Sequence, residues 1–123
     1  MPMLGGGFEL IVGWRQDAEF GPCLVVGRGG VTTEIDPDVV LIPKATSVEA
    51  VARGLTQLRC WPILAGYRGS PALDCGSVAE LGTRLYGLAV QHPDLEIELN
   101  PIFVRPDGIS IADFRGSQAG TSS

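Results

Sequence analysis

The stretch EIELNPIFVRPDGISIAD, residues 96–113, decides the fold that we expect for this chain. Glutamates alternate with aliphatic side chains from residue 96 to residue 99, as in a strand with one buried side. Residues 105–108 place proline second and glycine fourth, which are the preferences of a type I turn. Residues 109–114 then return as a second strand. The stretch therefore predicts an antiparallel hairpin.

The turn also sets the pairing within this hairpin, because a slip of one residue would move side chains to the opposite face. If Arg105 and Gly108, the first and last turn residues, close the hairpin, three pairs of residues oppose each other directly and their side chains share one face. That face is apolar near the turn and carries an amide and a carboxylate at its far end, where Glu98 joins them. The opposed pairs are Val104 with Ile109, Ile102 with Ile111, and Asn100 with Asp113.

Upstream residues predict short strands and then two helices. The pairs Thr46 with Glu49 and Ser77 with Glu80 fit capping boxes, and the two helices end before Pro62 and Pro93. The order strands, helix, helix, strands indicates an α+β fold, a mainly antiparallel sheet with two helices packed on one face. The predicted strands are residues 8–15 and 22–26, joined by the polar turn 16–21, and residues 31–35 and 39–42.

Composition limits what this chain can be. Its 123 residues suit one domain, which we expect at 8–115 between a flexible start (1–7) and a disordered tail (116–123). A net charge of -5 without any basic run argues against nucleic acid as a partner. Three widely spaced cysteines and one histidine argue against zinc and favour a reducing, cytoplasmic setting. No apolar stretch approaches the roughly 20 residues that span a bilayer, so we expect no membrane association.

Glu98, Asn100 and Asp113 form the one constellation with evident chemistry. Oxygen ligands from adjacent strands suit Mg²⁺ or Mn²⁺, which commonly combine one or two carboxylates with substrate phosphates. The alternative is a solvated strand end, where Arg115 pairs with the acids. The residues alone leave both interpretations open.

Five segments, in this order, resemble NDP-forming acyl-CoA synthetases, the ATP-grasp ligases that include succinyl-CoA synthetase β subunits. The resemblance covers about residues 5–115, and it is specific because weak motifs occur together in the family's order. The segments are residues 8–13 (FELIVG), 20–22 (FGP), 27–31 (GRGGV), 66–69 (GYRG), and the hairpin with its Glu-Leu-Asn-Pro and later Asp.

The resemblance implies a fold and a set of roles. The chain would be the second, C-terminal lobe of an ATP-grasp domain. Asn100 and Asp113 match residues that hold Mg²⁺ against the phosphates of ATP or ADP, and Glu98 matches a neighbouring acid. Glu9 matches an acid near the nucleotide ribose. The glycines of residues 27–30 match a segment near the active-site face, which makes Gly29 and Gly30 candidate nucleotide-binding residues.

The chain also departs from the family. It lacks the first ATP-grasp lobe, with its phosphate-binding lysine, and the CoA-binding domain, so both become expected partners from the same polypeptide or another subunit. We therefore expect a lobe of an acyl-CoA synthetase that is inactive alone, with self-association left open. The alternative is a non-catalytic interaction or assembly module derived from such a lobe.

Overall fold

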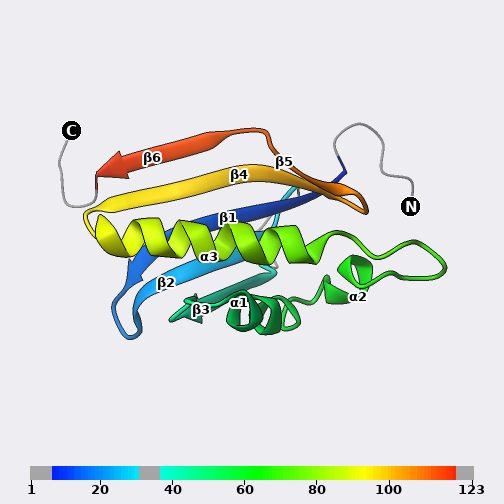
Figure 1. Ribbon diagram of the computed structural model, residues 1–123, viewed down its shortest axis with the longest axis horizontal. Helices are drawn as coiled ribbons and strands as arrows, with labels where there is room; N and C mark the ends of the chain where they lie inside the picture. The colour runs from blue at the N-terminus through cyan, green and yellow to red at the C-terminus, as the bar shows by residue number, and fades with distance from the viewer. Residues whose placement is uncertain (1–6, 31–36, 119–123) are drawn as a thin grey trace.

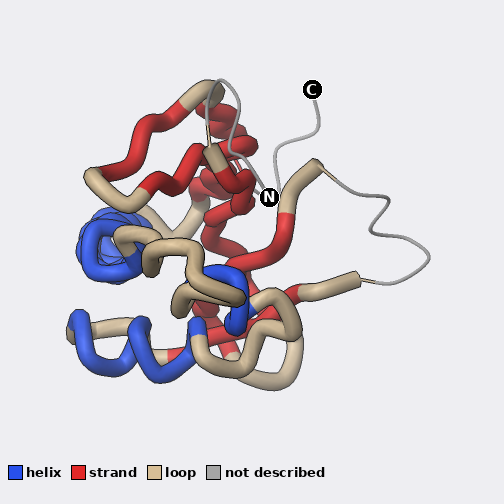
Figure 2. Tube along the Cα trace, turned by 90° about the vertical axis from the view of Figure 1, so that its right-hand side faces the viewer, coloured by secondary structure: helices blue, strands red, loops and turns tan. Residues whose placement is uncertain are grey.

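The computed structural model describes residues 7–30 and 37–118, which form a sheet covered on one face by helices (Figures 1 and 2). The six strands run in the order β3-β2-β1-β4-β5, and β6 also pairs with β4. Every pairing is antiparallel. The α+β class predicted from the sequence is confirmed. The strands are β1 Phe8–Asp17, β2 Gly21–Arg28, β3 Val39–Pro43, β4 Leu95–Arg105, β5 Gly108–Ile111 and β6 Phe114–Gln118.

The N-terminal hairpin is longer than predicted. β1 and β2 remain paired as far as Asp17 and Gly21, so much of the expected turn lies within strands. The Asp17 carboxylate accepts hydrogen bonds from the backbone N–H groups of Glu19 (2.9 Å) and Phe20 (3.1 Å), which closes the tighter turn. The strand predicted at 31–35 lies entirely outside the described residues, as does the turn residue Asp36. The next predicted strand is β3, which pairs with β2.

The first helix, α1 (Val48–Leu55), begins one residue later than the predicted cap. Ser47, not Thr46, is the N-cap, and its hydroxyl accepts a 3.1 Å hydrogen bond from Ala50 N–H. Both residues are good caps, and the sequence alone did not separate them. Pro62 does not simply stop this helix. It lies in the first turn of a third, four-residue helix, α2 (Trp61–Leu64), where its missing N–H is tolerated.

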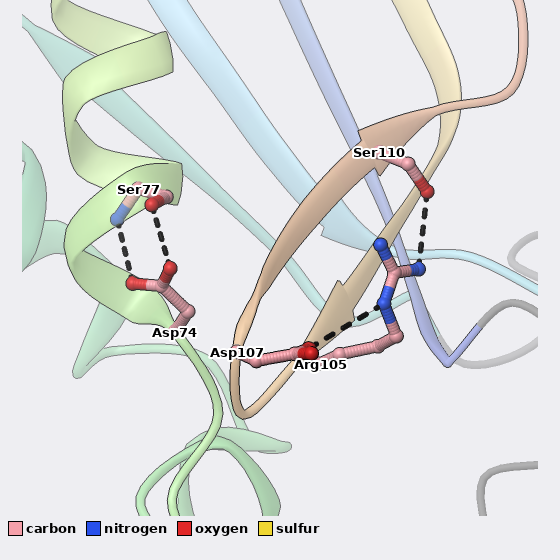
Figure 3. Close-up of polar contacts among 5 residues, drawn as sticks. All are labelled: Asp74, Ser77, Arg105, Asp107 and Ser110. Atoms are coloured by element: carbon pink, nitrogen blue, oxygen red, sulfur yellow. Dashed lines mark hydrogen bonds and ion pairs between the residues drawn. The ribbon is translucent and has the colours of Figure 1, made fainter.

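The long helix, α3 (Cys75–Gln91), also begins earlier than predicted. Asp74 is its N-cap, and Ser77 donates to the Asp74 carboxylate from both its backbone N–H (3.0 Å) and its hydroxyl (2.6 Å), as Figure 3 shows. The predicted capping box at Ser77 is therefore wrong, because a carboxylate three residues earlier takes both of its donors. The helix ends at His92 as predicted.

The C-terminal hairpin has the predicted register. Arg105 pairs with Gly108 and Ile102 with Ile111, and the same register continues through β6. The Asp74 backbone N–H donates to the Arg105 carbonyl (2.9 Å), which ties the start of α3 to this hairpin. Residues 116–118 lie in β6, where composition predicts a disordered tail. Residues 119–123 and 1–6 lie outside the described part of the chain.

A bulge interrupts β4 where it meets β1. The register between the two strands shifts between Leu10 and Val12, so that Asn100 and Pro101 together oppose Ile11. One extra residue in a strand reverses which side chains face each way from that point on.

The bulge corrects one prediction. Ile102 and Val104 are fully buried in the core, whereas the Asn100 side chain turns the other way, toward Glu98. The prediction that Asn100 and Asp113 share a face with the apolar residues near the turn is therefore wrong. Their separation from the core leaves them free for another role.

The core lies between the sheet and its helices. α3 packs over β1, β2 and β4, and α1 packs beside it on β3. Burial of the apolar side chains between these layers is the main stabilising contribution to the fold. The principal members of this core are Leu10, Val12, Trp14, Leu24, Val26, Val51, Leu55, Val78, Leu85, Ile97, Leu99, Ile102 and Val104.

Candidate functional site

The helices of the described residues all lie on one side of the sheet in Figure 2, and we call the opposite side the open face. Because strand side chains alternate, the residues between the core positions of β1 point to it. Glu9, Ile11 and Gly13 are these residues, since Leu10 and Val12 belong to the core. Register then assigns the neighbours across the sheet to the same face: Gly27, Gly29, Glu98, Phe103 and Arg115.

Glu9 meets Gly29 and Gly30 at one end of the open face. The Gly29 N–H donates to the Glu9 carbonyl (3.0 Å). The Glu9 carboxylate lies so close to Gly30 that a Cβ built there would be 2.8 Å from Glu9 Oε2. Gly30 also has a φ of +74°, which disfavours any other residue. The structure thus brings these three predicted residues together, with a carboxylate beside bare backbone.

Glu98, Asn100 and Asp113 meet on the same face. The Asn100 backbone N–H donates to the Asp113 carbonyl (3.2 Å), so these residues oppose each other as predicted. The Asn100 side-chain amide donates to Glu98 Oε1 (3.3 Å). One Asp113 oxygen accepts from Phe114 N–H (2.9 Å), and the other lies 3.7 Å from Arg115 Nε. The contact between Arg115 and an acid, foreseen as the alternative, is therefore present as well.

The donor chemistry of this group fits a hard cation. It offers two carboxylates and an amide oxygen, and the nitrogen end of that amide is engaged by Glu98. Within the described residues, no group of three or more His, Cys, Asp or Glu side chains is arranged to hold a metal. Mg²⁺ and Mn²⁺ commonly take one or two carboxylates from the protein, keep waters and take further ligands from phosphates.

Gly13 is a site feature that the sequence analysis missed. It lies between Glu98 and Val25 on neighbouring strands, and a Cβ there would come within 3.0 Å of the Ile97 carbonyl. The open face thus has three positions without side chains, at Gly13, at Gly27 on β2 and at Gly29 just beyond β2. A glycine inside a strand often marks close approach of a ligand or another backbone, and this was the available signal.

The cysteines do not contribute a nucleophile. Burial, together with Asp38, raises the pKa of Cys60 to about 12. Burial also raises the pKa of Cys23 and Cys75. Thiols held protonated in this way are poor nucleophiles, and all three are free. No helix in the described ranges is both long and apolar enough to cross a membrane.

The chain belongs to the ATP-grasp domain family, whose profile matches residues 1–116. Within it, the chain is an ATP-grasp segment of the kind found in NDP-forming acyl-CoA synthetases. It is 44% identical over 107 residues to trans-feruloyl-CoA synthase from an unidentified prokaryotic organism, covering 86% of this chain and 15% of that protein. It is 34% identical to the β subunit of an ADP-forming acetate–CoA ligase of Pyrococcus furiosus, covering 92% of this chain and 49% of the subunit.

A solved structure agrees with the observed fold. A chain of acetyl-coenzyme A synthetase 1 from Candidatus Korarchaeum cryptofilum, in complex with coenzyme A and Mg-AMPPCP, matches with a TM-score of 0.84 and 29% identity. The match covers 93% of this chain and 54% of that one. The chain therefore spans about half the length of the acetate–CoA ligase subunit and of the solved chain, and 15% of the feruloyl-CoA synthase.

Proposed function

We propose that this chain supplies the lobe that holds Mg²⁺ and the nucleotide phosphates in an NDP-forming acyl-CoA ligase. The observation that carries the proposal is the open face, where Glu9, Gly29 and the group at Asn100 gather opposite the helices. A second protein lobe or a ligand can come close to the backbone at these glycines. The relative crystallised with Mg-AMPPCP has the same lobe fold, which supports the choice of ligand.

Each residue has a distinct task in this proposal. Asp113 and Asn100 would hold the metal ion through their oxygens, and Glu98 would orient the Asn100 amide through the hydrogen bond between them. When bound, Mg²⁺ neutralises charge on the transferring phosphoryl oxygens. Glu9 would accept hydrogen bonds from the ribose hydroxyls, and the backbone at Gly29 and Gly30 would lie close to the nucleotide.

The complete enzyme requires parts that this chain does not contain. Phosphoryl transfer depends on positioning from both sides of the nucleotide, and one open face cannot exclude water or orient the second reactant. We propose that a first ATP-grasp lobe and a CoA-binding domain supply these functions in acyl-CoA and acid interconversion. The three free cysteines support a reducing, cytoplasmic setting for the enzyme.

The test is nucleotide turnover, dependent on acid and CoA, in an enzyme reconstituted from this chain, the missing lobe and a CoA-binding domain. Asp113→Ala should lower turnover by roughly two orders of magnitude or more, because it removes a metal ligand. Glu98→Ala should lower it less. The matched control is Glu80→Ala, an exposed acid on α3, which should change nothing. Near-normal activity of Asp113→Ala would refute the proposal, and absence of reconstituted turnover would favour an assembly module.

A further inference from the structure

Arg115 stands among the proposed metal ligands on the open face. It pairs across the sheet with Glu98, and its Nε lies 3.7 Å from Asp113 Oδ2. One cation thus adjoins both carboxylates of the group. Arg115 lies in β6, and its pairing with Glu98 assigns it to the same face of the sheet as the metal group.

The contact between Arg115 and Asp113 is weak enough to be exchanged. The two side chains are 74% and 54% exposed, and ion pairs this exposed to solvent contribute little to stability. A guanidinium also binds phosphate oxygens through two parallel hydrogen bonds, which a solvated carboxylate in single contact does not match. A phosphate chain arriving on the open face can therefore draw Arg115 away from Asp113.

We propose that Arg115 makes this site select a metal–nucleotide complex over the free metal ion. Without nucleotide, Arg115 offsets part of the negative charge of Glu98 and Asp113, which lowers the affinity for a bare divalent cation. When a metal ion arrives with nucleoside diphosphate or triphosphate, Arg115 turns to the phosphates and leaves Asp113 to the metal. Arg115 is thus a positioning residue that couples the two ligands. This inference rests on the function proposed above.

The experiment measures Mn²⁺ binding to the 123-residue chain from paramagnetic broadening of its backbone NMR signals, which detects weak binding. Mn²⁺ is titrated alone and then together with ADP. Arg115→Gln should tighten binding of Mn²⁺ alone by roughly three- to tenfold at low salt, since a nearby like charge is removed. In the same variant, ADP should enhance Mn²⁺ binding less than it does in the unaltered chain.

Two further variants separate the possible failures. Arg84→Gln removes the same charge from an exposed position on α3 and should leave both affinities unchanged. Asp113→Asn tests the proposed metal site itself. If Asp113→Asn leaves Mn²⁺ binding intact, or the unaltered chain binds none, the proposed function fails and this inference with it. If Asp113→Asn weakens binding but Arg115→Gln lacks either predicted effect, only the role of Arg115 is overturned.

Discussion

Asp38 is the only charged side chain that the described residues bury, at 8% exposure. Its two carboxylate oxygens accept from the backbone N–H groups of Arg59 (2.7 Å) and Cys60 (2.8 Å), between α1 and α2. Its carbonyl accepts from Arg28 N–H (2.9 Å), next to the glycines of the open face. Asp38 therefore connects the helical layer to the end of β2.

We expect Asp38→Ala to lower the free energy of unfolding by about 2–4 kcal/mol, because it leaves the backbone N–H groups of Arg59 and Cys60 without hydrogen-bond acceptors. Urea denaturation measures this loss. Asp107→Ala is the control, since its side chain is 88% exposed on the β4–β5 turn, and it should leave stability nearly unchanged. Equal effects of the two substitutions would contradict the role given to Asp38.

Cys60 should make the folded chain sensitive to alkaline pH. Its pKa is raised from 9.0 to about 12, so the folded chain keeps a proton that the unfolded chain loses above about pH 9. The stabilising contribution is complete below pH 9 and is lost as the pH rises toward 12. Urea midpoints measured across this window should fall with pH, and less steeply in Cys60→Ala. An identical slope in Cys60→Ala would show that Cys60 does not cause the loss of stability at alkaline pH.

At the scale of elements, α3 can lie close to the sheet because Gly82 carries no side chain. A Cβ there would be 2.7 Å from Leu24 Cδ2 and 3.1 Å from a Val51 methyl, and both of these residues are fully buried. Gly87, on the same helix, has nothing within 4 Å of a Cβ. The two glycines therefore allow the same substitution to be compared at a crowded and at an open position of one helix.

Gly82→Ala should destabilise the chain by about 1–3 kcal/mol through overpacking, although alanine is the better helix former. Gly87→Ala should instead stabilise it by about 0.5–1 kcal/mol, because only the gain in helix propensity remains. Thermal unfolding of both variants compares them directly. Effects of the same sign would mean that α3 does not approach β2 and α1 in this way.

Local chemistry predicts some elements well and others poorly. The Arg105–Gly108 turn determines the register of the C-terminal hairpin, because proline and glycine fit few turn positions. Helix starts are less well determined where good caps lie close together, as at Ser47 and Asp74. The bulge at Asn100 and Pro101 forms where β4 pairs with β1, which is distant in sequence, and the proline within the predicted strand was its only local signal.

At the scale of the molecule, the candidate site combines predictable and unpredictable parts. The opposition of Asn100 and Asp113 follows from one turn. Their placement on the open face with Glu9 depends on the order of β1 and β4 in the sheet and on the bulge between them. The contact between Arg115 and an acid was foreseen from the sequence, whereas the extension of β6 over residues 116–118 was not, because a disordered tail was expected there.

The pure 123-residue chain should neither hydrolyse nor transfer phosphate from ATP. Its open face can hold a metal and phosphates on one side, but it offers nothing to enclose the nucleotide from the other. Release of inorganic phosphate with Mg²⁺ present is the measurement, with the reconstituted enzyme as the positive control. Clear Mg²⁺-dependent turnover by the chain alone, abolished in Asp113→Ala, would contradict the half-site account.

The central claim is that metal and nucleotide bind on the open face, and NMR mapping with Mn²⁺ and ADP tests it most directly. Because broadening falls steeply with distance, substoichiometric Mn²⁺ should first erase the backbone signals around Asn100, Asp113 and Gly13. Signals of α1 and α3 should persist longer, since they lie a further layer of about 10 Å away. In Asp113→Ala, the signals around Asn100 and Gly13 should no longer broaden before those of α1 and α3. First broadening along the helices, or uniform loss across the chain, would contradict the account.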